Sequence, residues 1–184
     1  MKASVFCATS LDGLIAREDG AIDWLPGDDV EPHGYEEFMA SVDGIVIGRK
    51  TYEVVLGFGG WFYTEQVVVL SSTMKELNAP KGADCQLMSG EPSDVVAKLA
   101  ERGMTHLYID GGVTIQRFLN AGLISRMIIT RIPVLLGTGI PLFGPVPLDI
   151  RLEHVGTRLY KGGLVQSEYT IKITIVRLFF RAVV

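Results

Sequence analysis

The sequence predicts an α/β fold with a mixed, mostly parallel central sheet, flanking helices and antiparallel strands at the C-terminal end. Three observations predict it. Up to residue 133, short strand-like apolar runs alternate with helix-like segments, as in parallel crossover units. After Leu136 the helical pattern disappears. The last two strand-like runs are joined by Lys161-Gly162-Gly163, which is a hairpin signal.

Each element has a local signal. The first run alternates, is rich in β-forming residues and ends at the turn pair Asp12-Gly13. The uniformly apolar run 44–48 indicates a strand buried on both faces. Ser93 is the expected N-cap of a helix with an apolar face, and Ser71-Ser72-Thr73 is expected to cap a further helix. The expected strands are residues 1–10, 44–48, 66–70, 84–89, 105–109, 125–133, 150–160 and 164–172. The other expected helices are residues 35–42, 51–56 and 114–121.

The domain organisation is simple. The 184 residues suffice for one core, and no Pro/Ser-rich or charged linker divides them, so we expect one domain over residues 1–172. Residues 173–184 form an apolar C-terminal extension of unknown role, with charges only at Arg177 and Arg181. It is too short for a membrane span, which needs about twenty apolar residues. An edge strand, a subunit contact and an artificial extension remain as alternatives.

The composition argues against several classes of function. The formal net charge of −4 disfavours a nucleic-acid surface, because phosphate backbones are bound chiefly through Lys and Arg. Cys7 and Cys85 lack partners at ligand spacing, so neither a metal site nor a disulfide framework is expected. Asp12 and Arg17 interrupt the opening apolar run before a secretory signal could form. We therefore expect a cytoplasmic protein without a membrane partner.

Two stretches far apart in the chain share one device, in which an apolar run ends at glycine and a helix with an early threonine follows. They are Gly48-Arg49-Lys50-Thr51 and Gly111-Gly112-Val113-Thr114. A helix N-terminus exposes unpaired N–H groups and a positive dipole end, and glycine lets an anion approach closely. Arg49 and Lys50 add positive charge. Together the turns predict a ligand with several phosphates and hence a nucleotide-cofactor enzyme. An ordinary helix start is the alternative for each turn alone.

Two further segments suit the same ligand. Ser71 and Ser72 follow a strand, where hydroxyl groups can bind a ribose or its 2′-phosphate, with helix capping as the alternative. Asp110-Gly111-Gly112 lacks the full G-x-G-x-x-G pattern, so a standard Rossmann unit is not indicated. The diglycine still allows a pyrophosphate or a nicotinamide to approach the backbone, and a tight turn is its alternative role.

Candidate catalytic residues are few. No Ser/His/Asp or Cys/His arrangement is recognisable, and His106, inside an apolar strand, is expected to be a hydrogen-bonded core residue. The long loop 17–33 contains Trp24, which is a candidate lid residue or a loop anchor. Asp12 and Thr130 are candidate substrate or proton-relay contacts.

These segments, in this order, resemble the dihydrofolate reductase fold, a three-layer arrangement. Within it they resemble the bacterial group related to the riboflavin biosynthesis reductase (RibD C-terminal-like) domain. The resemblance covers residues 2–172. It rests on residues 10–16, 23–26 and 47–53, on Gly111-Gly112 followed by Phe118-Leu119, and most specifically on residues 133–143. It implies an NADPH-dependent reductase that transfers a hydride to a small heterocyclic, pterin- or pyrimidine-like, or carbonyl substrate. Examples of such activity are 5-amino-6-(5-phosphoribosylamino)uracil reductase and dihydrofolate reductase. The resemblance also implies a homodimer.

The resemblance assigns roles to the cofactor residues. Ala8 and Ile15 would line the nicotinamide, and Arg49 with Ser71 or Ser72 would contact the 2′-phosphate. The pyrophosphate would be held by Gly48, Lys50 and Thr51, and the cofactor wall would be completed by Gly111, Gly112, Thr114 and Ile115. A non-catalytic nucleotide-binding or oligomeric interaction module on a reductase-like fold is the alternative function.

Three positions depart from the family pattern. The acidic residue that grips the pterin in dihydrofolate reductases should fall near Gly34, where no carboxylate stands, although Glu36 and Glu37 are close in the sequence. The second turn has Asp110 where a third glycine is usual and Val113 where an arginine can sit.

Overall fold

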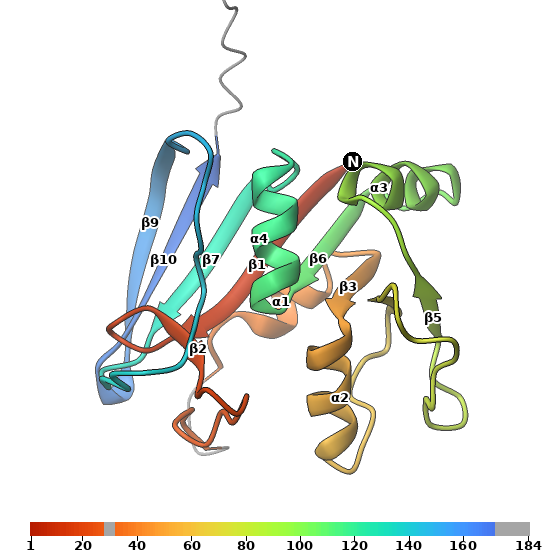
Figure 1. Cartoon of the computed structure of the whole chain (residues 1–184). Coiled ribbons are helices and arrows are strands. Elements are labelled where there is room, and N and C mark those ends of the chain that lie inside the picture. Colours follow the sequence, from red (N-terminus) through yellow and green to blue (C-terminus); the bar gives the residue numbers. More distant parts are fainter. Residues whose placement is uncertain (28–31, 172–184) are drawn as a thin grey trace, which may run out of the picture.

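The computed structural model describes residues 1–27 and 32–171 (Figure 1). The predicted extension 173–184 lies outside the described residues. The main sheet has eight strands in the order β5-β4-β3-β6-β1-β7-β10-β9, and β2 pairs with β8 in a separate small sheet. The strands are β1 (Lys2–Thr9), β2 (Leu14–Ala16), β3 (Gly44–Gly48), β4 (Gln66–Leu70), β5 (Cys85–Met88), β6 (His106–Asp110), β7 (Arg126–Arg131), β8 (Ile140–Pro141), β9 (Leu152–Tyr160) and β10 (Leu164–Ile171). The helices are α1 (Tyr35–Met39), α2 (Arg49–Gly57), α3 (Pro92–Glu101) and α4 (Gly112–Asn120).

The pairing confirms the predicted mixed sheet. β1 is parallel to both β6 and β7, and β3 is parallel to both β4 and β6. β10 is antiparallel to β7 and to β9, and Gly162 and Gly163 between these last two strands adopt positive φ angles of 78° and 79°. Because the parallel strands point the same way, their carboxyl ends meet at one edge of the sheet, which we call the carboxyl edge.

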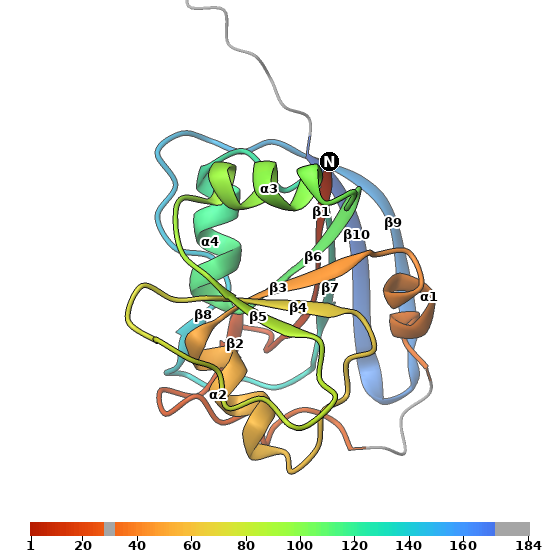
Figure 2. The ribbon, with the colours of Figure 1, turned by 90° about the vertical axis from the view of Figure 1, so that its right-hand side faces the viewer.

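The sheet lies between two helical layers, as the three-layer fold requires (Figures 1 and 2). On one face, Val95 and Leu99 of α3 and Phe118 of α4 pack on a cluster that includes Val46 and Ile109. On the other face, the cluster contains side chains of α1 and α2, including Phe38 and Tyr52. We call this second side the α1 face. Alternation along each strand decides which side chains reach which face.

Several local predictions were wrong. No helix follows Ser71-Ser72-Thr73, because the Ser71 hydroxyl accepts the backbone N–H of Thr73 and of Met74 and closes a turn within a loop. Ser93 lies inside α3 and is not its N-cap. The helix begins with Pro92, whose fixed φ and missing N–H suit a first helical position, and Glu91 is the N-cap. The short pair β2 and β8 was not predicted.

His106 is hydrogen-bonded, as its apolar surroundings predicted. Its Nδ1 donates to the Ser41 carbonyl oxygen at 2.7 Å, and its Nε2 lies 2.7 Å from the Ser4 hydroxyl. The backbone N–H of the same residue donates to the Asp43 carboxylate. These bonds tie the start of β6 to its neighbours, at the opposite end of the strand from Asp110.

Candidate cofactor and substrate site

The two glycine turns lie side by side. β3 and β6 are neighbouring parallel strands, with Ile47 opposite Asp110, so Gly48 and Gly111 follow at the same edge. Gly48 is the N-cap of α2 and Gly111 is the N-cap of α4, and neither cap has a side-chain hydrogen bond. Two helix N-termini with unpaired N–H groups therefore begin at one place on the carboxyl edge.

The turns also interlock sterically. A Cβ atom on Gly48 would lie 2.8 Å from the Thr114 hydroxyl oxygen, and a Cβ atom on Gly111 would overlap the Thr51 hydroxyl oxygen. Each threonine thus fills the space beside the glycine of the other turn. Gly111 has a φ of 86°, which disfavours any side chain, whereas Gly48 has an ordinary extended φ of −83°. The structure brings together four predicted cofactor residues that no sequence spacing connects.

The nicotinamide residues that the resemblance implies also approach this edge. A Cβ atom on Gly112 would lie 2.8 Å from Ile15 Cδ1, so Ile15 of β2 packs against the start of α4. Ala8 lies near the end of β1, in register with Thr130 on β7. Ile115 is 1% exposed and lies in the core beneath the second turn. Ile115 is therefore a core residue of this turn and does not reach the surface.

A cavity of about 500 Å³ opens beside the first turn. It is lined by Arg49, Leu70, Ser71, Ser72, Thr73, Ser89, Gly90, Glu91 and Arg117. Arg49, Ser71 and Ser72, which the sequence predicted as one phosphate site, therefore share one cavity. Lys50 is exposed in the first turn of α2 and does not line it.

The guanidinium group of Arg117 is a cation of this cavity that sequence reasoning missed. Its Nη2 donates to the Gly90 carbonyl oxygen at 2.9 Å and lies 3.7 Å from a Glu91 carboxylate oxygen. Arg49 forms a similar half-exposed pair with Glu53 on the next helical turn, at 3.1 Å. Arg117 stands one turn beyond the glycine motif, so only the packing of α4 on β3 and β6, which brings Arg117 to the loop after β5, reveals its place.

Asp110 is a second residue whose importance the sequence did not indicate. Burial raises the pKa of its carboxyl group, and the Gly111 N–H opposes that shift only in part. Burial, and then the charge of Asp110, raise the pKa of Tyr35 to about 12 and that of Tyr63 still higher. Tyr108, on the same strand as Asp110, is affected in the same way. Asp110 therefore has neutral phenols around it on the α1 face.

Thr130 belongs to a buried polar network. The Gln166 side-chain nitrogen donates to the Thr130 hydroxyl oxygen at 3.0 Å and to the His33 carbonyl oxygen at 2.9 Å. Thr130 and Gln166 are 5% and 7% exposed, so both are shielded from bulk water. This network joins β7 and β10 to the loop that precedes α1. Gln166 was not among the predicted site residues.

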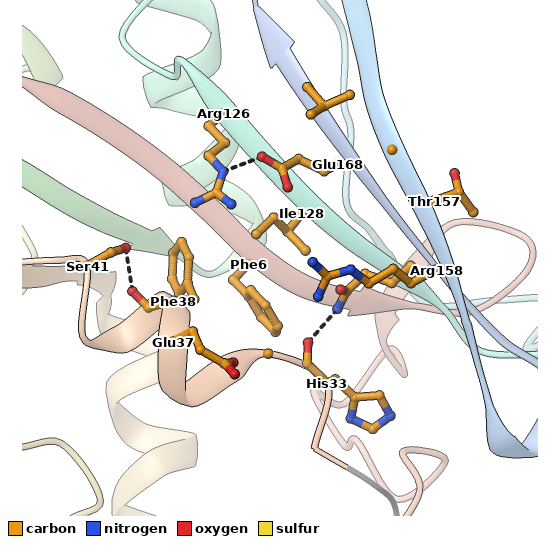
Figure 3. Close-up of a pocket in the computed structure, with 14 residues that line it drawn as sticks. Phe6, His33, Glu37, Phe38, Ser41, Arg126, Ile128, Thr157, Arg158 and Glu168 are labelled. Carbon is orange, nitrogen blue, oxygen red and sulfur yellow. Dashed lines mark hydrogen bonds and ion pairs between the residues drawn. The ribbon is translucent and has the colours of Figure 1, made fainter.

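A second cavity, of about 480 Å³, lies between α1 and the β9–β10 hairpin (Figure 3). Phe6, Phe38 and Ile128 are its apolar lining residues, and Arg126 and Glu168, on the neighbouring strands β7 and β10, form an ion pair beside them at 2.7 Å. Gln166 and His33 line its end nearest the carboxyl edge. Gln166 therefore connects the Thr130 network to the end of this groove.

The other two candidate catalytic residues have structural contacts. The Asp12 carboxylate accepts the backbone N–H of Gly137 at 2.8 Å and of Leu136 at 3.3 Å. The Ser10 hydroxyl and the Gly137 N–H lower the pKa of Asp12 to about 2. Trp24 is half-buried in its loop, and its Nε1 is buried without an acceptor among residues 1–27 and 32–171. Catalytic roles for Asp12 and Trp24 stay predictions.

Over residues 1–27 and 32–171, no group of three or more His, Cys, Asp and Glu side chains is arranged to hold a metal ion. Within the same part of the chain, no helix has the length and apolar character needed to cross a membrane.

Comparisons with known proteins agree with this geometry. The model of the RibD C-terminal domain family matches residues 2–166. The uncharacterized protein YwjB of Bacillus subtilis is 32% identical over 91% of this chain and 97% of its own length. A crystal structure of a putative riboflavin biosynthesis protein from a Shewanella species is 41% identical, with a TM-score of 0.88 over 94% of this chain and 99% of that one. A dihydrofolate reductase from Enterococcus faecalis, complexed with NADP(H), is 18% identical, with a TM-score of 0.65 over 93% of this chain and 96% of that one. This last likeness concerns the fold.

Proposed function

The chain belongs to the RibD C-terminal domain family, and from this membership we propose that it is an NADPH-dependent reductase of a small heterocyclic or carbonyl substrate. The observation that carries the proposal is the meeting of Gly48 and Gly111 at one edge, each beside a threonine of the other turn. That arrangement keeps two helix N-termini accessible to one polyanionic ligand.

The residues present fit the pyrophosphate of such a cofactor. Glycine at positions 48 and 111 lets the two turns pack against each other through the Thr114 and Thr51 hydroxyl groups, which brings the two helix N-termini together. The hydroxyl groups of Thr51 and Thr114 can donate to phosphate oxygens, and Lys50 adds a charge at the first turn of α2. This part of the site would not distinguish NADPH from NADH, because both carry a pyrophosphate.

The 500 Å³ cavity supports a preference for NADPH. It offers two guanidinium groups, from Arg49 and Arg117, together with the hydroxyl groups of Ser71 and Ser72. Two cations and several hydroxyl donors suit a doubly charged phosphate monoester, which in NADPH is the 2′-phosphate. The carboxylates of Glu53 and Glu91 hold the two guanidinium groups through weak, half-exposed ion pairs that a phosphate can outcompete.

The chemistry follows from the carboxyl edge. When bound, NADPH would supply a hydride to the carbon of a C=N or C=O group and leave as NADP⁺. Asp110 keeps its proton to a higher pH than an ordinary aspartate, because burial disfavours its anion. Its carboxyl group can give that proton to the substrate nitrogen or oxygen as the double bond is reduced, and then regain one from water. Tyr35 and Tyr63 stay neutral and add no competing negative charge.

The proposal is tested by following NADPH consumption by the purified chain with an aldehyde, a cyclic imine, a pyrimidinedione and a dihydropterin as separate acceptors. We expect oxidation of NADPH matched by reduced product with at least one acceptor, and much slower oxidation of NADH. Tight binding of NADPH without oxidation in the presence of any acceptor would contradict the proposal. It would favour a non-catalytic nucleotide-binding module.

A further inference from the structure

We infer that Gln166 is a positioning residue that turns the Thr130 hydroxyl into a hydrogen-bond donor toward the substrate. The site then selects a substrate edge that carries an acceptor, such as a carbonyl oxygen, over an amidine edge. The inference deepens the proposed function and rests on it for the location of the substrate.

The orientation of the Gln166 amide is fixed by its partners. A backbone carbonyl oxygen can only accept hydrogen bonds, so the amide atom 2.9 Å from the His33 oxygen must be the nitrogen. The Tyr160 hydroxyl lies 3.2 Å from the other amide atom, Oε1, and donates to it. Both ends of the amide are therefore held, and the reversed orientation would place two acceptors against each other at His33.

This orientation determines the polarity of Thr130. One amide hydrogen of Gln166 goes to His33, and the other goes to the Thr130 hydroxyl oxygen at 3.0 Å. Thr130 is the acceptor in that bond, so its own hydroxyl hydrogen points elsewhere. In the part of the chain that the structure describes, no second partner of the Thr130 hydroxyl is present. A buried donor without an acceptor is destabilising, and a ligand atom that accepts the bond removes that cost.

The position of this donor suits the reaction. Thr130 lies beside Ala8, and β1 runs between β7, which carries Thr130, and β6, which ends at Asp110. Ile128 and Tyr108, two residues before Thr130 and Asp110 on their strands, both belong to the core of the α1 face. Strand alternation places Thr130 and Asp110 on that face too. Thr130 lies opposite Ala8, whereas Asp110 follows Tyr108, which lies opposite Ser4. A substrate that covers the second half of β1 would therefore lie between a hydrogen-bond donor on β7 and a proton donor on β6.

The same place lacks what an amidine needs. A protonated amidine is bound through paired N–H groups that a carboxylate accepts. Gln166 is neutral, and Gly34 has no side chain. The Glu37 carboxylate does approach Gly34, 3.5 Å from the position of a Cβ atom there, but the Arg158 guanidinium lies 4.0 Å from the same point (Figure 3). Its positive charge opposes a cationic ligand, whereas a carbonyl-bearing ring meets no such opposition.

The experiment measures, by calorimetry at neutral pH, how tightly the chain binds two probes. Uracil carries carbonyl acceptors, and 2,4-diaminopyrimidine carries an amidine edge. We expect the wild-type chain to prefer uracil by about tenfold or more. Gln166→Glu should gain about tenfold for 2,4-diaminopyrimidine, because it adds a carboxylate beside Thr130. Gln166→Met, which matches the side-chain length without charge, should lose uracil affinity and gain nothing for the amidine.

A second pair of variants keeps the test decisive should Gln166→Glu fail to fold. Thr130→Val should remove the preference for uracil, and Thr130→Ser should restore it. A folded Thr130→Val protein with the wild-type preference, or no uracil binding at millimolar concentration by the wild type, would overturn the inference. Both readouts are independent of turnover. If the wild type prefers uracil but does not oxidise NADPH, the reductase proposal alone is contradicted. If the wild type oxidises NADPH but Thr130→Val still prefers uracil, this inference alone is contradicted.

Discussion

The two glycine turns use the same strand-to-helix device and yet differ in charge and in backbone freedom. The first places Arg49 and Lys50 directly after a glycine with an ordinary extended φ. The second has no cation in its first helical turn, follows a desolvated carboxyl group at Asp110, and needs a glycine because its φ is 86°. Under the proposed function, the first turn would attract the phosphates, while the second would fix the backbone and present an acid at the edge where the substrate reacts.

The largest expected effect is that of Asp110→Asn. Loss of the proton donor should lower the rate of reduction by about 10²–10⁴-fold. In the wild type, the rate should fall as pH rises through the raised pKa of Asp110, and this fall should vanish in the variant. Rates measured across pH with saturating NADPH check both points. An unchanged rate and an unchanged pH profile would remove Asp110 from the chemistry.

The same variant should be more stable than the wild type. The folded pKa of Asp110 lies above its unfolded value, so the folded state binds its proton more tightly. The contribution of this group to the free energy of unfolding is therefore fully present below the unfolded pKa and is lost as pH rises through the folded pKa. Asparagine has no charge to bury, so Tm should increase at neutral pH and differ least in acid. Thermal unfolding monitored by circular dichroism checks this. A lower Tm for Asp110→Asn than for the wild type at neutral pH would contradict the prediction.

Alanine at the two glycines should separate steric from backbone effects. Gly111→Ala should cost about 1–3 kcal/mol because of its positive φ, in addition to the overlap with Thr51. Gly48→Ala should cost less, since only the contact with Thr114 opposes it. The free energy of unfolding in denaturant is then measured for the double variants Gly48→Ala/Thr114→Ala and Gly111→Ala/Thr51→Ala. Thr114→Ala should rescue Gly48→Ala fully, whereas Thr51→Ala should rescue Gly111→Ala only in part. Equal rescue would disprove the assigned difference in backbone strain.

Lys50→Ala should have a smaller effect that does not depend on the cofactor. Because the pyrophosphate is common to both nucleotides, the affinities for NADPH and NADH should fall by similar factors, about tenfold or less at an exposed lysine. The loss should shrink as salt is added. Fluorescence titrations at low and high ionic strength check this. A selective loss of NADPH affinity would instead place Lys50 at the 2′-phosphate.

The smallest effect is expected for Asp12→Asn, which serves as the carboxylate control for Asp110. The folded pKa of Asp12 is about 2, below its unfolded value, so its contribution to stability is present above the unfolded pKa and is lost as pH falls toward 2. The variant should show a slightly lower Tm near neutral pH and no difference in strong acid. Its rate should keep the pH profile of the wild type. If the rate of Asp12→Asn no longer fell as pH rises, Asp12 would have the proton-relay role predicted from the sequence.

Much of the fold was predictable because strand burial leaves a direct trace in the sequence. Ile45, Val46 and Ile47 are apolar without alternation and form the fully buried β3. The Gly162-Gly163 pair predicted the hairpin because its positive φ angles favour glycine. Predictions failed where two local signals compete. Pro92 determined the start of α3 in place of Ser93, and Ser71 closed a turn in place of capping a helix.

The site was only half predictable, for a physical reason. A glycine turn before a helix is a local device, so Gly48 and Gly111 could be recognised one at a time. Arg117, Gln166 and Asp110 acquire their surroundings from residues distant in the sequence. These are the segment after β5 for Arg117, the loop before α1 for Gln166, and the phenols of the α1 face for Asp110. No spacing rule connects these residues. Asp110 even looked like a departure from a glycine pattern, although its side chain is the acid nearest the second turn.

The most direct test of the central claim is a titration of the full chain with NADPH and, separately, with NADH, followed by quenching of Trp24 and Trp61 fluorescence. The wild type, Arg49→Ala and Arg102→Ala are compared, since Arg102 is an exposed arginine that contacts Gln86 and does not line the cavity. We predict NADPH-preferring binding that weakens by about 10–100-fold in Arg49→Ala and is unchanged in Arg102→Ala. Failure of the wild type to bind either nucleotide at millimolar concentration would contradict the account and leave the two turns as ordinary helix starts.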